Sequence, residues 1–240
     1  MRTHRRSFIE QKTKRNKLVR IALYGVIAIT AYSILTSLVF STHTLDNNSM
    51  KPQLRAKDRF IVSSLAVRSS LTKLGLFEHA VPFNRGDIVL IDRKRTKIPN
   101  IIVVVADSIV RFCTLQTVSL LSNHENFYIK RVVALPGDEV TVSGFVCRVK
   151  QRGESYAVTE LELTDKPYNI DIPQVPALWD ESLPFASSQE TVIVGEQECY
   201  VVSDDRSNTN DSRTWGPIPL SMVTGRVMFR YWPLNRLGVP

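Results

Sequence analysis

The sequence has few of the side chains that metal-dependent, cysteine-based and histidine-based hydrolases use. Only four histidines and three cysteines occur among its 240 residues. No catalytic motif surrounds the histidines, and Cys113, Cys147 and Cys199 follow no metal-ligand spacing. We therefore expect no metal and no other cofactor. A disulfide between Cys147 and Cys199 and three buried thiols are both compatible with this pattern.

Net positive charge is almost absent beyond the N-terminus. The formal net charge is +8, and residues 1–20 hold eight Lys or Arg against one acid, a net +7. About +1 is left for the remaining 220 residues. The basicity is therefore a local tail, which we expect on the cytoplasmic side of a membrane, and no nucleic-acid partner is expected.

Charged residues are also absent from residues 21–40. As a helix this segment would be about 30 Å long, enough to cross the hydrocarbon core of a bilayer. A cleaved secretory signal is the alternative, but the segment exceeds a typical signal core and no A-x-A-like site follows it. We expect a single-pass transmembrane helix that leaves residues 41–240 on the extracytoplasmic side.

Long amphipathic helices do not alternate with the later apolar runs, so a parallel α/β sheet is not indicated. The runs are short, rich in Val, Ile, Phe and Tyr, and separated by Gly, Pro, Asp and Asn. We predict a mostly β, antiparallel catalytic domain over 41–240, with insertions near 94–126 and 151–198. The strand-like runs are 58–67, 86–93, 127–135, 139–150, 191–205 and 225–233.

One apolar segment, residues 101–121, is interrupted by Asp107 and Arg111. These residues and Thr114 follow helical spacing and would form a narrow polar stripe. Charges at that depth disfavour a second membrane span. A helix in the membrane interface and a helix packed on the β-domain are equally compatible with the pattern.

Lys130 lies in a strand-like run with apolar neighbours. Strand alternation predicts that it shares a face with Tyr128 and Val132. Most strand lysines extend their amine into water, where the pKa is near 10.4. Burial among apolar residues would lower that pKa and give a neutral amine, which can act as a general base. Ser-Lys pairs are a known variant of the catalytic triad.

Several segments, in the order that the family has them, resemble the bacterial type I signal peptidases, which are membrane-anchored Ser-Lys proteases. The resemblance spans about residues 15–238 and includes the N-terminal anchor. Its specific elements are the S-M-x-P-x-L motif at 49–54, the segments 58–62 and 85–91, the lysine-containing "YIKRVVALPGDEV" at 128–140, and the last segment at 200–233, which holds the box "SDDRSNTNDSR".

The resemblance implies that Ser49 is the nucleophile and Lys130 the general base. In the family, a hydroxyl in the last box orients the lysine amine, and the matching residue is Thr209, where Ser is usual. A Ser two residues before the nucleophile often helps its backbone N–H to bind the oxyanion. Asn47 stands there, and its amide could donate the same kind of hydrogen bond.

Other residues of the last box are expected to support the site: Asp204, Arg206, Asp211 and Arg213. Asp211 and Arg213 match the D-S-R element and would brace the site as an ion pair. Ser203 replaces a Gly and Asp205 an Asn of the family pattern, so the turn there could differ. Met50 and Ile129 are candidates to line shallow pockets for small substrate side chains.

The resemblance implies removal of N-terminal signal peptides from exported preproteins at the bacterial inner membrane. The expected partners are signal-peptide-bearing preproteins and membrane lipid, with the secretion machinery as a further candidate. Two alternatives are a self-cleaving repressor-type Ser-Lys protease, which lacks a membrane anchor, and the endoplasmic-reticulum relative, which has His for Lys. A third is a catalytically impaired, membrane-anchored module that binds preproteins.

Overall fold

The computed structural model describes residues 15–27, 31, 40–64, 81, 83–93, 100, 102–103, 106–107, 110, 127–164, 166–174 and 189–240. Residues 15–27 are helical and exposed, and Phe40 begins a strand. Most of the predicted membrane span between them lies outside these ranges. Within the ranges, no helix combines the length and the apolar character needed to cross a membrane. The predicted transmembrane helix therefore stays a prediction.

The described part of residues 40–240 is built mainly from short strands joined by turns. The strands are β1 (Phe40–Thr44), β2 (Arg59–Ser64), β3 (Ile88–Asp92), β4 (Phe127–Ala134), β5 (Glu139–Ser143), β6 (Val146–Lys150), β7 (Val158–Thr159), β8 (Gln189–Ile193), β9 (Glu198–Val202), β10 (Ile218–Pro219) and β11 (Val223–Trp232). The short helices are α4 (Ser212–Trp215), η2 (Leu220–Met222) and η3 (Leu234–Arg236).

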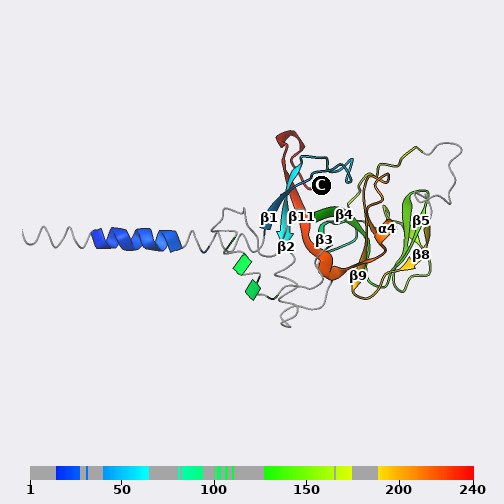
Figure 1. The fold of residues 1–240 in the computed structure, drawn as a ribbon, viewed down its shortest axis with the longest axis horizontal. Helices are drawn as coiled ribbons and strands as arrows, with labels where there is room; N and C mark the ends of the chain where they lie inside the picture. Colours follow the sequence, from blue (N-terminus) through cyan, green and yellow to red (C-terminus); the bar gives the residue numbers. More distant parts are fainter. Residues whose placement is uncertain are drawn as a thin grey trace, which may run out of the picture.

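Two antiparallel sheets form the body (Figure 1). The larger sheet has the strand order β1-β2-β11-β3-β4-β9-β10, and the smaller has the order β7-β6-β5-β8. All pairings between the named strands are antiparallel. This confirms the predicted mostly β, antiparallel class.

The larger sheet is buried on both faces near its centre. Alternate residues of β3 enter different clusters: Ile88 and Leu90 pack in one, and Val89 and Ile91 in another. Successive side chains of a strand face opposite ways, so an unbroken apolar run is required where both faces are covered. β4 lies next to β3, so its residues also enter buried surroundings on both sides.

Two of the predicted strand runs are divided in the structure. The run 139–150 forms the hairpin β5–β6, whose turn residues Gly144 and Phe145 have φ of 58° and 66°. Two positive φ values in succession match the right-handed twist of a tight hairpin. The run 191–205 holds the end of β8 and the whole of β9, which belong to different sheets.

The two predicted insertions are only partly described. In 101–121, the described positions 102–103, 106–107 and 110 are helical, and Asp107 is buried. The polar-stripe residues Arg111 and Thr114 lie outside the described ranges. In 151–198, Asp171 forms a backbone bridge with Asp205, which lies in the loop after β9.

Candidate active site

Ser49 lies in a tight turn shortly after β1. Its side chain is buried, and its backbone N–H donates to Oδ1 of Asn47 over 3.0 Å. Met50 and Leu54, both 0% exposed, anchor the turn in the core, and the N–H of Leu54 bonds the carbonyl of Met50. The carbonyl of Ser49 accepts from the N–H of Asp205 over 3.1 Å. The turn is thus held both by the core and by the loop after β9.

Lys130 lies in β4 with only 2% of its surface exposed. Its neighbours at alternate positions, Tyr128 and Val132, pack in the same apolar cluster, as the strand pattern predicted. Burial lowers the pKa of Lys130 to about 8, against an opposing effect of Asp211, while Arg213 lowers it further. The amine is therefore partly neutral near neutral pH.

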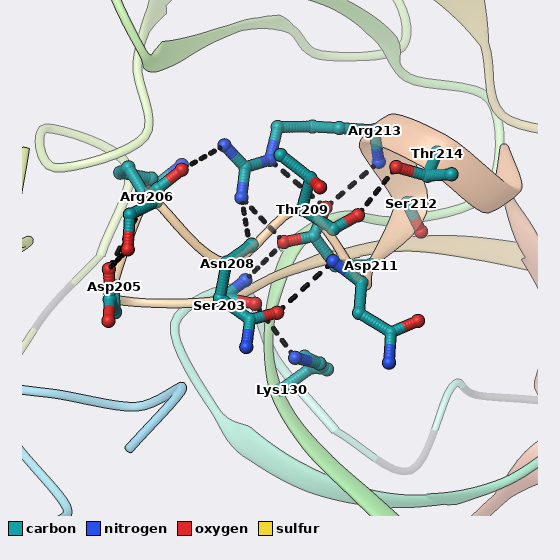
Figure 2. Close-up of polar contacts among 12 residues, drawn as sticks. Lys130, Ser203, Asp205, Arg206, Asn208, Thr209, Asp211, Ser212, Arg213 and Thr214 are labelled. Carbon is teal, nitrogen blue, oxygen red and sulfur yellow. Dashed lines mark hydrogen bonds and ion pairs between the residues drawn. The ribbon is translucent and has the colours of Figure 1, made fainter. Parts of the chain in front are cut away.

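The Lys130 amine is bound by Ser203. Lys130 Nζ donates to Ser203 Oγ over 2.7 Å, and both side chains are buried (Figure 2). The register explains the contact, because Arg131 pairs with Val202, and one step further the antiparallel ladder sets Lys130 opposite Ser203. No hydrogen bond joins Lys130 to Thr209, although the structure describes both residues. The contact that the family resemblance implied for Thr209 is made by Ser203.

The two residues expected to react meet the same short segment, 203–205. Lys130 bonds the side chain of Ser203, and Asp205 bonds the backbone of Ser49. The segment therefore brings the turn after β1 to the end of β4. The described contacts include no hydrogen bond between the Ser49 hydroxyl and the Lys130 amine.

Arg131, the residue after Lys130, lies on the opposite face of β4. It binds Asp204, the residue after Ser203 in the loop that follows β9. Arg131 donates to both carboxylate oxygens of Asp204, over 2.7 and 2.6 Å, and to the carbonyl of Gly86 over 2.6 Å. Its guanidinium also lies 3.9 Å from the ring centroid of Tyr168. Both carboxylate oxygens of Asp204 are therefore paired, by a partner that was not predicted for it.

Arg206 is buried against the insertion. Its Nη2 donates to Oε2 of Glu160 over 2.7 Å, and the hydroxyl of Tyr168 donates to the same oxygen over 2.7 Å. The other oxygen of Glu160 accepts from the N–H of Cys147. Glu160 and Tyr168 were not anticipated, because nothing in the sequence links an insertion residue to the last box.

Asp211 and Arg213 form the ion pair that the D-S-R element suggested. Arg213 Nη2 lies 2.8 Å from Asp211 Oδ2, and Arg213 also binds the carbonyls of Arg206 and Asn208 (Figure 2). Asp211 caps α4 and accepts from the N–H of Ser203 over 2.9 Å. Burial opposes ionisation of Asp211, but the bonds from Arg213 and the backbone outweigh it and hold its pKa below the ordinary value.

A cavity of about 380 Å³ lies beside the Ser49 turn. It includes Ile129 but not Met50, which is 0% exposed within the core. Consecutive strand residues face opposite ways, so Ile129 faces the cavity while Lys130 faces Ser203. The other lining residues are Thr42, His43, Thr44, Leu45, Asp46, Asn47, Leu90, Phe127 and Tyr231.

The described cysteines are not paired. Cys147 and Cys199 are free and buried, and they belong to different apolar clusters. Burial raises the pKa of both thiols above the ordinary value. Cys113 lies outside the described residues. The disulfide alternative is therefore wrong for Cys147 and Cys199.

The known proteins that resemble this chain include signal peptidases from three bacteria. Signal peptidase I of Leptolyngbya laminosa is 28% identical over 218 residues, which cover 91% of this chain and 81% of the relative. Signal peptidase I of Bacillus caldolyticus is 24% identical over 215 residues, or 88% and 90% of the two chains. Signal peptidase IB of Staphylococcus aureus is 31% identical over 116 residues, or 48% and 58%. The family model described as signal peptidase, peptidase S26, matches residues 18–232, so the chain belongs to this family of hydrolases.

Proposed function

We propose that the chain is a membrane-anchored serine endopeptidase that removes signal peptides from exported preproteins, with Ser49 as nucleophile and Lys130 as general base. One observation carries the assignment of the base. Lys130 is buried, with its pKa lowered to about 8, and it bonds the loop that also binds the Ser49 turn. A solvated strand lysine would have none of these properties.

The lowered pKa has a large effect on the supply of neutral amine. With a pKa of about 8, about a quarter of the Lys130 amines are neutral at pH 7.5. With an unperturbed pKa of about 10.5, the neutral fraction would be about one in a thousand. Burial therefore increases the population of the competent base more than a hundredfold, on the order of 200-fold.

The proton transfers of the reaction use these two side chains and water. Neutral Lys130 takes the proton of the Ser49 hydroxyl while Oγ attacks the scissile carbonyl carbon. The Lys130 ammonium gives that proton to the leaving amine nitrogen as the C–N bond breaks. Lys130 next takes a proton from water, whose oxygen attacks the acyl ester, and returns the proton to Ser49 Oγ.

An extended substrate would lie along the strands that flank the site and add main-chain hydrogen bonds. The cavity beside Asn47 and Ile129 offers room for a substrate side chain near the scissile bond. Its volume of about 380 Å³ is larger than a methyl group needs. A preference for small residues would therefore depend on the surroundings of Ser49 and not on this cavity.

The N-terminal segment supports the proposed anchor. The large apolar side chains of residues 18–27 are each at least 52% exposed. Apolar residues on every side of a helix suit a lipid surrounding, and the basic residues before them favour a cytoplasmic N-terminus. We place the chain in the bacterial inner membrane with residues 41–240 outside the cytoplasm. Retention in the membrane pellet after alkaline extraction tests the anchor; release into the supernatant would contradict it.

An impaired relative that binds preproteins without cutting them is the second candidate. The observation in its favour is the bond from the Ser49 N–H to Asn47, which occupies a donor that an oxyanion would need. The described contacts also include no hydrogen bond between the Ser49 hydroxyl and the Lys130 amine, and this too favours the second candidate. The two candidates differ in one outcome, the cleavage of a bound preprotein.

The deciding experiment incubates the purified full-length chain, in detergent, with a preprotein that carries an A-x-A site. We expect cleavage, and Ser49→Ala and Lys130→Ala should each reduce its rate on the order of 10⁴-fold or more. Ser143→Ala and Lys150→Ala are matched controls, because they remove a Ser and a Lys from strands of the smaller sheet. Cleavage at an unchanged rate in either dyad variant would remove that residue from the mechanism, and binding without cleavage by the unmodified chain would favour the second candidate.

A further inference from the structure

The hydroxyl that contacts the Lys130 amine belongs to a position where the family pattern has no side chain. Ser203 stands where that pattern has Gly, and Thr209 stands where it has the orienting Ser. In this chain Lys130 Nζ donates to Ser203 Oγ over 2.7 Å. Among the contacts of the described residues, no hydrogen bond joins the Thr209 hydroxyl to Lys130. The bonds of Thr209 go to its backbone carbonyl, which accepts from the N–H of Asp211 and the hydroxyl of Thr214.

Ser203 is held firmly enough to orient another group. Its side chain is 0% exposed, and its N–H donates to Asp211 Oδ2 over 2.9 Å. Asp211 is in turn fixed by the guanidinium of Arg213 over 3.0 and 2.8 Å. The hydroxyl is thus attached to a backbone that two further charged groups hold in place (Figure 2).

An amine at the end of a flexible side chain needs such a partner. The Lys130 amine can rotate about its Cε–Nζ bond, and only some orientations direct the nitrogen lone pair at Ser49. A hydrogen bond from one N–H to a fixed acceptor removes most of that freedom, which is how positioning groups accelerate proton transfer. The acceptor also stabilises the ammonium that forms after proton transfer, because hydrogen bonds from charged donors are the stronger ones.

We propose that Ser203 is the positioning residue for the Lys130 amine in this chain and that the orienting hydroxyl has moved from position 209 to position 203. The inference rests on the proposed function, because it assumes that Lys130 is the general base. It adds a residue to that site and assigns Thr209 no direct contact with the amine.

The test compares Ser203→Ala with Thr209→Val in the full-length chain, using preprotein cleavage over a range of pH. We expect Ser203→Ala to lower kcat about 10- to 100-fold with little change in KM. It should also move the acid limb of the rate profile to lower pH, since the ammonium loses its acceptor while Asp204, Asp205, Asp211 and Arg213 stay in place. Thr209→Val should lower kcat less than Ser203→Ala does.

A matched control separates positioning from folding. Ser212→Ala removes another buried hydroxyl of the same region, which accepts from the N–H of Val201 and does not contact Lys130. It should lower the melting temperature without moving the acid limb. Ser203→Gly is the second variant in case Ala disturbs the fold, because it removes the hydroxyl and adds no atom. It should show the same loss of kcat and the same shift as Ser203→Ala.

The outcomes separate this inference from the proposed function. If the unmodified chain does not cleave the preprotein, the proposed function fails, and the inference fails with it. If the unmodified chain cleaves, and Ser203→Ala and Ser203→Gly keep its kcat and pH profile, only the inference is overturned. A larger loss in Thr209→Val than in Ser203→Ala would return the orienting role to Thr209.

Discussion

Arg131 and Asp204 form a buried ion pair with two hydrogen bonds, directly beside the contact between Lys130 and Ser203. Lys130 and Arg131 are consecutive in β4, and Ser203 and Asp204 are consecutive in the loop after β9. The two contacts therefore lie on opposite faces of the larger sheet. One face carries the reactive amine, and the other carries a salt bridge with side-chain exposures of 4% and 0%. The loop after β9 is thereby fixed from both sides at the point where it meets the amine.

The rate of cleavage should depend on pH through Lys130. The base must be neutral, so kcat/KM should rise as the pH increases through about 8, the pKa to which burial lowers this amine. The negative charge of Asp205 raises that pKa. Asp205→Asn should therefore move the acid limb to lower pH and increase the rate near pH 7. The pH profile of kcat/KM measures both effects.

Asp171→Asn is the matched control for this change. Asp171 pairs with Asp205 only through the backbone, so its variant should leave the acid limb in place. If the acid limb of the kcat/KM profile stays at the same pH in Asp205→Asn, or moves to higher pH, the proposed effect of this charge is wrong. An acid limb that reports a group other than Lys130 would stay at the same pH in both Asp205→Asn and Asp171→Asn.

Keeping Lys130 buried should destabilise the folded chain at low pH. Its folded pKa of about 8 is below the ordinary 10.5, a difference that corresponds to about 3 kcal/mol. When the pKa of a group is lower in the folded state than in the unfolded state, the free energy of unfolding is highest above the unfolded-state pKa. It decreases as the pH falls from the unfolded-state pKa through the folded-state pKa. Lys130→Met removes the buried charge, so it should raise the free energy of unfolding by up to about 3 kcal/mol at pH 6.

The gain in Lys130→Met should shrink between pH 8 and 10.5, where the wild-type amine becomes neutral in the folded state. Chemical unfolding of the detergent-solubilised chain, followed by tryptophan fluorescence, measures this dependence. Lys150→Met is the control, because Lys150 is more exposed and pairs with Glu139. Equal stability of wild type and Lys130→Met at pH 6 would show that the buried amine carries no such cost.

The strands and the apolar neighbours of Lys130 could be predicted from the sequence because their signals are local. Apolar, β-branched runs mark strands, and the alternation around Lys130 gave its correct neighbours. The turn at Gly144 was missed because its hairpin interrupts a run that is apolar on both sides. Phe40 was assigned to the apolar segment, since only pairing with β2 distinguishes a strand there.

The hydrogen-bond partner of Lys130 could not be predicted, because a family pattern relates roles to sequence positions and does not give the distances between side chains. Thr209 kept the hydroxyl at the expected position, but the register of β4 and β9 sets Ser203 opposite the amine. Glu160 was missed for a related reason. Its contact with Arg206 joins segments 46 residues apart in the chain, and no sequence spacing indicates such a contact.

The buried pair of Arg206 and Glu160 should contribute strongly to stability. Both side chains are 1% exposed, so Glu160→Gln leaves a buried guanidinium without its counter-charge. Such a change costs about 3–5 kcal/mol, measured as the free energy of unfolding. Glu196→Gln breaks the exposed pair with Arg152 and should cost less than about 1 kcal/mol. Equal losses in the two variants would contradict the importance of burial here.

Asn47 provides the last prediction, because its present contact and its proposed role exclude each other. Its Oδ1 accepts from the Ser49 N–H in the structure, so that N–H can bind an oxyanion only after the exposed Asn47 side chain turns. If the side chain then donates its own N–H, Asn47→Ala should lower kcat by about 100- to 1000-fold with little change in KM. Asn48→Ala is the control, because Asn48 also binds a backbone N–H of this loop, that of Ala56, and should affect stability alone. A wild-type or higher kcat in Asn47→Ala, together with a lower melting temperature, would show that Asn47 only closes the turn in the absence of substrate.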